Sequence, residues 1–329
     1  MEKKYSVKIC ANFDAYYYAF YVLGIMRFFK NEQLSFTNRD SQGLPSDCFA
    51  FVTAPRVRFF IDARDTSSID LNGAAWCSVY GKVNYSSRVI PADLFSKIKP
   101  IGPNFGIRLW SVTKAFFLAF NNFLICRKEI KDIRTHFANY WRQYRYRVSE
   151  SHYVYKPPQN DYIFSLNSIW KDDIWTNQLR NTFFKCCRSI NDIDFEGGFA
   201  PRTNIRGYEQ FTVSKRYEIT EYLEKTKSSF VVFNTPAVKK CLGWKLGEYL
   251  ALGKAIISIP LEREMPVPLI HGKHVHFVDG KEVSILEAIN LIHKNKEYRE
   301  NLEINAREYY LSNLCPERVI ERLVLADKV

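Results

Sequence analysis

The stretch "KKCLGWKLGEYLALGKAIIS", Lys239 to Ser258, predicts a helix that ends at Gly253, with the strand "AIISI" directly behind it. Lys239, Lys240 and Lys245 fall where this helix is expected to begin. A helix start already carries about half a positive charge, so cations there are unfavourable unless an anion binds nearby. We therefore expect a diphosphate at this helix start, with a solvated basic turn as the alternative.

The same alternation of strand and helix continues on both sides and predicts an α/β protein. Such βαβ units form parallel sheets covered by helices, so we expect two α/β domains with Rossmann-like parallel sheets. The expected strands are "YSVKICANF", "VRFFID", "DYIFSLNSIW", "SFVVFN", "AIISI" and "HVHFV"; the expected helices include "AYYYAFYVLGIMRFFK", "LWSVTKAFFLAFNNFLIC" as a buried helix, "DIWTNQLRNTFFKCCRSI" and "VSKRYEITEYLEKTK".

Four further signals mark the ends of elements. The Gly- and Arg-containing stretch "DFEGGFAPRTNIRGYEQF" is expected to be an irregular loop. Ser284 and Glu287 have the spacing of a capping box that starts a helix, and Pro316 stands in the favoured first turn of the last helix. Pro157 and Pro158 favour an extended connection. We expect an N-terminal domain over 1–157, a second domain over 158–315, and a C-terminal helix over 316–329 that packs back toward the first domain.

Charge and cysteine content narrow the class of protein. Residues 1–156 hold 23 Lys and Arg against 12 Asp and Glu, whereas residues 157–329 hold 24 against 23, so the two halves are expected to meet different partners. Eight cysteines without a CxxC pair predict reduced thiols rather than a disulfide framework or a zinc site. The N-terminus lacks a signal-peptide pattern, and the longest apolar run is too short to span a bilayer. These features predict a cytoplasmic protein.

The loop after the strand "SFVVFN" is the expected ligand site, because ligands bind beyond the carboxyl ends of parallel strands. Asn234 and Thr235 open this loop. Gly243 lets backbone approach a ligand closely, and the free N–H groups of Trp244 and Lys245 are expected to point toward a phosphate. One turn into the helix, Glu248 is placed to accept hydrogen bonds from ribose hydroxyls.

These residues resemble a known family. "GWKLGEYLALGKAIIS" is similar to the donor-site signature of GT-B glycosyltransferases, and the resemblance extends through "PLEREMPVPLIHGKHVHFVDG" to cover roughly residues 160–315. It is greatest to the glycosyltransferases of bacterial surface (capsular and O-antigen) polysaccharide clusters. The resemblance implies two Rossmann-like domains whose parallel sheets face each other across a cleft, an acceptor-binding domain over 1–157 and a donor-binding domain over 158–315. It also implies transfer of a sugar from a nucleotide-sugar donor to a hydroxyl of a glycan or lipid-diphosphate-linked glycan. It also implies that Glu248 holds the donor ribose, while the family's first glutamate falls on Lys240, where this chain departs from the pattern.

Further donor residues follow from the resemblance, since the family neutralises the diphosphate with an arginine and a lysine. Arg202, Arg206, Lys215 and Arg216 are the candidates, of which we favour Arg202 and Lys215. GT-B enzymes stabilise the leaving diphosphate with such cations, so neither a metal nor another cofactor is expected. The histidines at 271, 274 and 276 have no clear carboxylate partner in the sequence.

The base that activates the acceptor is expected in the first domain, where a carboxylate follows a strand. Asp62 and Asp65 follow "VRFFID", and Asp14 follows the first strand; each has a turn or helix cap as its alternative role. We also expect acceptor contacts from the loops that carry Lys82, Asn84 and Asn104.

The stretch "RKEIKDIRTHFANYWRQYRYRV", residues 127–148, mixes basic and aromatic side chains. This composition is typical of a helix that rests on an anionic membrane surface, which predicts a peripheral location on the inner face of the cytoplasmic membrane; a helix with a solvated basic side is the alternative. Two other functions stay open. They are a basic nucleic-acid-binding protein, disfavoured because no binding motif is present, and a catalytically inactive nucleotide-sugar-binding protein.

Overall fold

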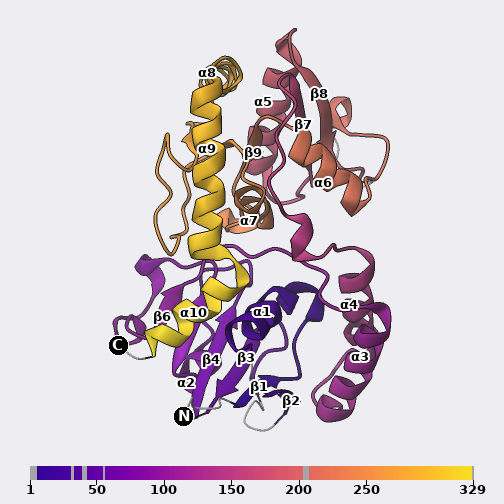
Figure 1. The fold of residues 1–329 in the computed structure, drawn as a ribbon, viewed down its shortest axis with the longest axis vertical. Helices are drawn as coiled ribbons and strands as arrows, with labels where there is room; N and C mark the ends of the chain where they lie inside the picture. Colours follow the sequence, from indigo (N-terminus) through magenta and orange to yellow (C-terminus); the bar gives the residue numbers. More distant parts are fainter. Residues whose placement is uncertain (1–5, 31–32, 39–42, 55, 203–206, 328–329) are drawn as a thin grey trace. The chain divides into compact units, whose positions relative to one another are not determined.

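The computed structural model describes residues 6–30, 33–38, 43–54, 56–202 and 207–327, which form two compact units. Unit 1 contains the chain up to His152, together with Arg263–Pro266 and the segment that begins at Asn313. Unit 2 contains Tyr153–Glu262 and Val267–Ser312. Both units combine helices with parallel strands, so the chain is an α/β protein (Figure 1). The bounds of the units lie a few residues before the positions 157 and 315 expected from the sequence.

Unit 1 is built on a six-stranded sheet with the order β2-β1-β3-β4-β5-β6. All neighbours are parallel except β3, which is antiparallel to both β1 and β4. The expectation of a wholly parallel sheet is wrong here, because the connection from β3 to β4 is too short for a crossover. The strands are β1 Ser6–Cys10, β2 Gln33–Thr37, β3 Phe49–Thr53, β4 Val57–Asp62, β5 Val79–Lys82 and β6 Ile98–Pro100.

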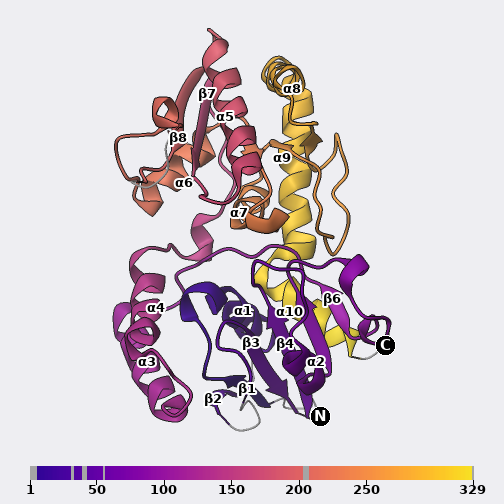
Figure 2. The same ribbon diagram turned by 180° about the vertical axis from the view of Figure 1, so that it is seen from behind.

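Helices cover both faces of this sheet (Figures 1 and 2). α1 (Ala15–Phe28) and α10 (Pro316–Ala326) pack together on one face, although almost the whole chain separates them. Their approach depends on Gly24, because a Cβ at this position would lie 2.2 Å from the Pro316 carbonyl oxygen. The short α2 (Leu71–Trp76) lies on the other face, where its Gly73 meets the Phe60 ring.

A pair of helices, α3 (Val112–Cys126) and α4 (Ile133–Arg145), completes unit 1 and lies side by side in both views (Figures 1 and 2). The predicted helix over 109–126 is confirmed, but its predicted burial is wrong. Ala115 and Ala119 are buried, whereas Phe116 and Phe117 are 62% and 70% exposed. Small side chains let the two helices approach each other, and the large aromatic side chains therefore face outward.

Unit 2 contains two parallel sheets, in which β7 pairs with β8, and β10 lies between β9 and β11. The expected irregular loop after Ile193 begins instead with β8, which pairs along its whole length with β7. The strands are β7 Tyr162–Asn167, β8 Asp194–Phe199, β9 Val232–Asn234, β10 Ile256–Ser258 and β11 His276–Phe277. The helices are α5 Ile174–Ser189, α6 Ile219–Ser228, α7 Trp244–Ala251, α8 Glu282–Lys294 and α9 Lys296–Tyr309.

The crossover helices hold the core of unit 2. Phe183 of α5 stacks on Phe233 of β9 with ring centroids 4.6 Å apart.

The expected capping box is wrong by one turn, since Lys281 is the N-cap of α8 and Ser284 lies inside the helix. Each of the eight cysteines is free. Among the described residues, no helix is both long and apolar enough to cross a membrane.

Candidate functional site

The carboxyl ends of β7 and β9 in unit 2 lead into the loops that precede α5 and α7. The loop after β9 contains a short 3₁₀ turn, Val238–Lys240, in which Lys239 and Lys240 adopt φ angles of 56° and 59°. Residues other than glycine rarely adopt this left-handed backbone conformation, so the turn is strained and is held in place by its surroundings. α7 itself begins at Trp244, so two of the three lysines stand in the turn before the helix.

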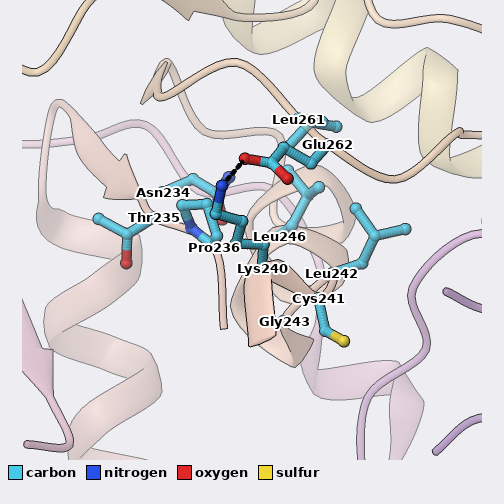
Figure 3. Close-up of a pocket in the computed structure, with 10 residues that line it drawn as sticks. All are labelled: Asn234, Thr235, Pro236, Lys240, Cys241, Leu242, Gly243, Leu246, Leu261 and Glu262. Atoms are coloured by element: carbon cyan, nitrogen blue, oxygen red, sulfur yellow. Dashed lines mark ion pairs between the residues drawn. The ribbon is translucent and has the colours of Figure 1, made fainter. Parts of the chain in front are cut away.

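Figure 3 shows a small pocket at the entry to α7. Asn234, Thr235 and Gly243, which were predicted to bind the donor, line it, whereas Trp244 and Lys245 do not. Gly243 is the N-cap of α7, and its φ of −86° is open to any residue. The complete lining is Asn234, Thr235, Pro236, Lys240, Cys241, Leu242, Gly243, Leu246, Leu261 and Glu262.

Lys240 forms an ion pair with Glu262 beside this pocket (Figure 3). Its ammonium also lies 5.7 Å from the centroid of the Trp175 ring. Lys240 occupies the position of the first glutamate in the family signature. The signature's glutamate is thus absent at this position, and the carboxylate at this edge of the pocket comes from Glu262 instead.

Arg180, which the sequence did not lead us to predict, reaches the ends of both strands from α5. Its Nε donates to Thr235 Oγ1 at 3.0 Å, and its Nη1 donates to the Ser168 carbonyl at 2.7 Å. Arg180 is only 6% exposed. A charged residue in the buried row formed by Thr176, Arg180 and Phe183 was the signal that could have identified it.

Lys245 points to the same strand end as Arg180. Its Nζ donates to the Leu166 carbonyl and lies 3.5 Å from Tyr249 Oη. Tyr222 also contacts this ammonium, with the ring centroid 5.4 Å away. In the part of the chain that the structure describes, the hydrogen bonds of Arg180 and Lys245 go to neutral oxygens. Two cations thus share one strand end, and neither forms a close ion pair with a described carboxylate.

Burial and mutual repulsion make these two cations unfavourable on their own. Burial lowers the pKa of Arg180 to about 10. Burial, with the positive charge of Arg180, also lowers the pKa of Lys245, and the more distant Glu248 only partly opposes this shift. An anion bound between the two cations would remove both penalties.

Glu248 is buried, with 5% of its surface exposed, and it does not line the pocket. Its carboxylate accepts hydrogen bonds from Tyr222 Oη at 3.2 Å and from Tyr153 Oη at 3.5 Å. The carboxylate therefore faces tyrosines, and its charge offsets only part of the effect of burial on Lys245. Its predicted role with the ribose stays a prediction.

The other predicted cations lie on the surface. Arg202 is exposed, and its Nη1 donates to the Ile169 carbonyl at 2.6 Å. Lys215 is exposed and pairs with Glu221 at 2.6 Å. Arg216 is also exposed, and Arg206 lies outside the described residues. Arg202 therefore donates to the residue directly after Ser168, which accepts from Arg180, whereas Lys215 pairs with Glu221 away from this strand end.

In unit 1, Asp62 and Lys82 form an ion pair of 2.7 Å, and neither side chain is exposed. Asp62 also accepts hydrogen bonds from Tyr80 at 2.7 Å and from Arg64 at 2.9 and 3.0 Å. Burial alone would raise the pKa of Asp62, but the hydrogen bond from Arg64 and the charge of Lys82 lower it overall. For Lys82 burial outweighs the attraction of a single carboxylate, so its pKa is lowered. The predictions of Asp62 as the base and Lys82 as an acceptor contact therefore need correction, because neither is available to a substrate.

Asp14 lies in a different setting, at the carboxyl end of β1. It caps α1 by accepting from the Tyr16 amide at 2.8 Å, and its other oxygen accepts from Asn139 at 2.8 Å. Burial raises its pKa. Asp14 lines a large pocket within unit 1, together with Asn12, His136, Asn139 and polar residues between Lys128 and Thr135.

The remaining candidates in unit 1 have separate positions. Asp65 is exposed. Asn84 and Asn104 are both buried, and their amides donate to the carbonyls of Arg64 at 2.8 Å and Tyr17 at 3.1 Å. These two asparagines support loops from within, so their predicted acceptor contacts need correction. Among the described residues, no group of three or more His, Cys, Asp or Glu could hold a metal ion.

Comparisons with known proteins give similarity in structure alone. No family model and no curated protein matches the chain. A glycosyltransferase from Rickettsia africae ESF-5 has a TM-score of 0.45 and 9% identity over 80% of this chain and 68% of its own. The C-terminal domain of LpcC, a glycosyl transferase group 1 family protein from Francisella tularensis, has a TM-score of 0.37 and 13% identity over 47% of this chain and 86% of its own. Sucrose-phosphate synthase from Thermosynechococcus elongatus has a TM-score of 0.44 and 12% identity, covering 81% and 63%. With TM-scores this low, we base the function on the site itself.

Proposed function

We propose that this protein is a glycosyltransferase that moves a sugar from a nucleotide-sugar donor to a hydroxyl of a glycan or lipid-diphosphate-linked glycan. The observation that supports it is the pair of cations, Arg180 and Lys245, at the strand end beside the entry to α7. Buried or half-buried charges without a close counter-ion are costly, so their presence favours an anionic ligand. A diphosphate matches two cations beside a helix N-terminus.

Arg180 and Lys245 would also stabilise a nucleoside diphosphate as it leaves the sugar. Negative charge develops on the diphosphate as the bond to the sugar breaks, and fixed cations in a shielded site stabilise that charge. Arg180 and Lys245 are held by Ser168, Thr235 and Leu166, so little reorganisation is needed. We expect the transfer to proceed without a metal ion, because the side chains supply the positive charge that Mg²⁺ provides elsewhere.

We assign the role of base to Asp14. A general base needs a carboxylate in a pocket with a pKa above its ordinary value, and Asp14 meets both conditions. Asn139 fixes one oxygen of the carboxylate and so orients it. Asp14→Asn should abolish transfer and leave nucleotide binding intact; undiminished transfer would place the base elsewhere.

The experiment that tests the donor site is a thermal-shift screen with UDP, GDP, CDP, ADP and dTDP, with and without Mg²⁺. A ligand that binds the native state raises its melting temperature by mass action. We expect a shift with one diphosphate that does not depend on Mg²⁺, and its loss in Arg180→Met. Lys185→Met is the matched control, since Lys185 is an exposed cation on the same helix. No shift with any of the five nucleotides would overturn the proposal.

The proposed acceptor also predicts where in the cell the enzyme acts. A lipid-linked acceptor would hold the enzyme peripherally at the inner face of the cytoplasmic membrane, and the excess of basic residues in 1–156 supports attraction to anionic lipid.

A further inference from the structure

The outward side of α3 in unit 1 carries a row of apolar side chains along the length of the helix, and Thr113, Lys114 and Asn121 are exposed beside it. Val112, Phe116, Phe120 and Leu124 recur every fourth residue, so they form one row along the helix, with Phe117 beside it. Their exposed fractions are 43%, 62%, 50%, 54% and 70% in the order Val112, Phe116, Phe120, Leu124 and Phe117. Large apolar side chains that gather on one unpartnered helix face mark an interaction surface. We call these five residues the α3 face.

The opposite side of α3 fixes the direction in which the α3 face points. Ala115, Ala119 and Asn122 are buried there. His136 Nε2 of α4 lies 2.9 Å from the Ala119 carbonyl, and Asn122 donates to Tyr140 Oη at 2.8 Å. These buried polar contacts hold α3 in one rotation about its axis, so the α3 face is directed away from α4.

Basic residues flank the α3 face. Between Val112 and Arg145 the chain has seven Lys and Arg against two Asp and Glu, and all seven basic side chains are exposed. Four of them lie in or beside the turn that joins α3 to α4, directly after Leu124. The seven are Lys114, Arg127, Lys128, Lys131, Arg134, Arg142 and Arg145.

We propose that the α3 face inserts into the interfacial region of an anionic lipid bilayer, with the basic residues at its ends bound to lipid headgroups. An apolar helix face bordered by Lys and Arg is the pattern of a helix that lies in the plane of the membrane. Charge complementarity selects lipid over another copy of this chain, because the same basic residues would be brought together in a symmetric dimer. The inference extends the membrane location proposed above and moves its main contact from residues 127–148 to α3.

The test is sedimentation of the full-length protein with vesicles of phosphatidylcholine, with and without phosphatidylglycerol. The variant Phe117→Asp/Phe120→Asp places two charges in the α3 face. The control Val283→Asp/Ile304→Asp makes the same change in charge at apolar side chains of unit 2 that are 66% and 57% exposed. We expect the wild type and the control to bind the anionic vesicles, and the α3 variant to bind at least about tenfold less.

Two results would overturn the proposal: equal binding of the wild type to neutral and anionic vesicles, or undiminished binding of the α3 variant. Size-exclusion chromatography with light scattering tests the alternative that the α3 face is an interface between two copies of the chain. A wild-type dimer that the α3 variant converts to a monomer, without vesicle binding by either, would assign the α3 face to a second copy of the chain. Nucleotide-induced thermal shifts, recorded on the same variants, report on unit 2 and keep a failure of this inference distinct from a failure of the proposed transferase activity.

Discussion

Asp62 is held by more donors than any other candidate residue in unit 1, and this decides what its replacement would do. Asp62→Asn leaves Lys82 buried without its anion, which typically costs about 3–5 kcal/mol. We expect a correspondingly lower urea midpoint for unit 1. Asp65→Asn is the control, since Asp65 is exposed and such changes stay within about 0.5 kcal/mol. Equal midpoints for the two variants would contradict the ion pair.

The same carboxylate gives a pH dependence with a defined sign. The pKa of Asp62 is lower in the folded protein than in the unfolded chain, so its contribution is fully present above the unfolded value of about 4. It is lost as the pH falls from there through the folded pKa. The stability difference between the wild type and Asp62→Asn should therefore be constant near neutral pH and shrink below about pH 4.

Lys245 predicts a proton linked to nucleotide binding. Its pKa in the free protein is lowered by burial and by Arg180, and a bound diphosphate would raise it again. At about pH 8 the binding of a nucleoside diphosphate should therefore take up protons. Calorimetry in buffers with different ionisation enthalpies measures this number directly. Lys245→Met should show no uptake, and a wild type without uptake would place the diphosphate away from Lys245.

At the scale of elements, the packing of α1 against α10 reverses the usual effect on stability of replacing a helical glycine by alanine. Replacing a glycine inside a helix by alanine usually stabilises the helix by about 0.5–1 kcal/mol. At Gly24 the new Cβ would clash with the Pro316 carbonyl, so Gly24→Ala should lower the melting temperature instead. Met26→Ala is the control on the same helix, since Met26 is 37% exposed. A higher melting temperature for Gly24→Ala would show that the two helices do not pack in this way.

Local patterns predicted most of these elements but not their pairing. Pro316 does begin α10, and the apolar run before Asn234 does form β9, because both signals act within a few residues. The antiparallel β3 and the exposed face of α3 were missed, since each depends on what packs beside it. Phe117 is equally apolar in a core and on a surface, so sequence alone could not decide its burial.

Some residues of the candidate site could likewise be predicted from the sequence around them, whereas others are brought there only by the fold. The positions of Gly243, Asn234 and Thr235 in the pocket lining could be predicted because these residues follow a strand and precede a helix, while their contact with a donor stays a prediction. Arg180 lies on a different element, and only the fold brings it to Thr235. The surface cations Arg202 and Lys215 were preferred to it because the resemblance pointed to that part of the chain.

At the scale of the whole molecule, unit 1 depends on the chain beyond Ser312. Truncation after Ser312 would remove α10 and expose the face of α1 around Gly24. We expect hydrogen exchange to become faster in β1 and β4, while the strands of unit 2 stay protected. Truncation after Ala326 is the control, because it leaves α10 complete. Unchanged exchange in unit 1 after the longer truncation would contradict its discontinuous construction.

The position of α10 also has a consequence for synthesis on the ribosome. Domains usually fold in the order in which they emerge, beginning at the N-terminus. Here every residue of unit 2 precedes Asn313, whereas unit 1 receives α10 only after all of unit 2 has been translated. The part of unit 1 before Tyr153 must therefore wait, with one apolar helix face uncovered, until α10 has been translated. Nascent-chain chaperones would meet this protein at the part that was made first.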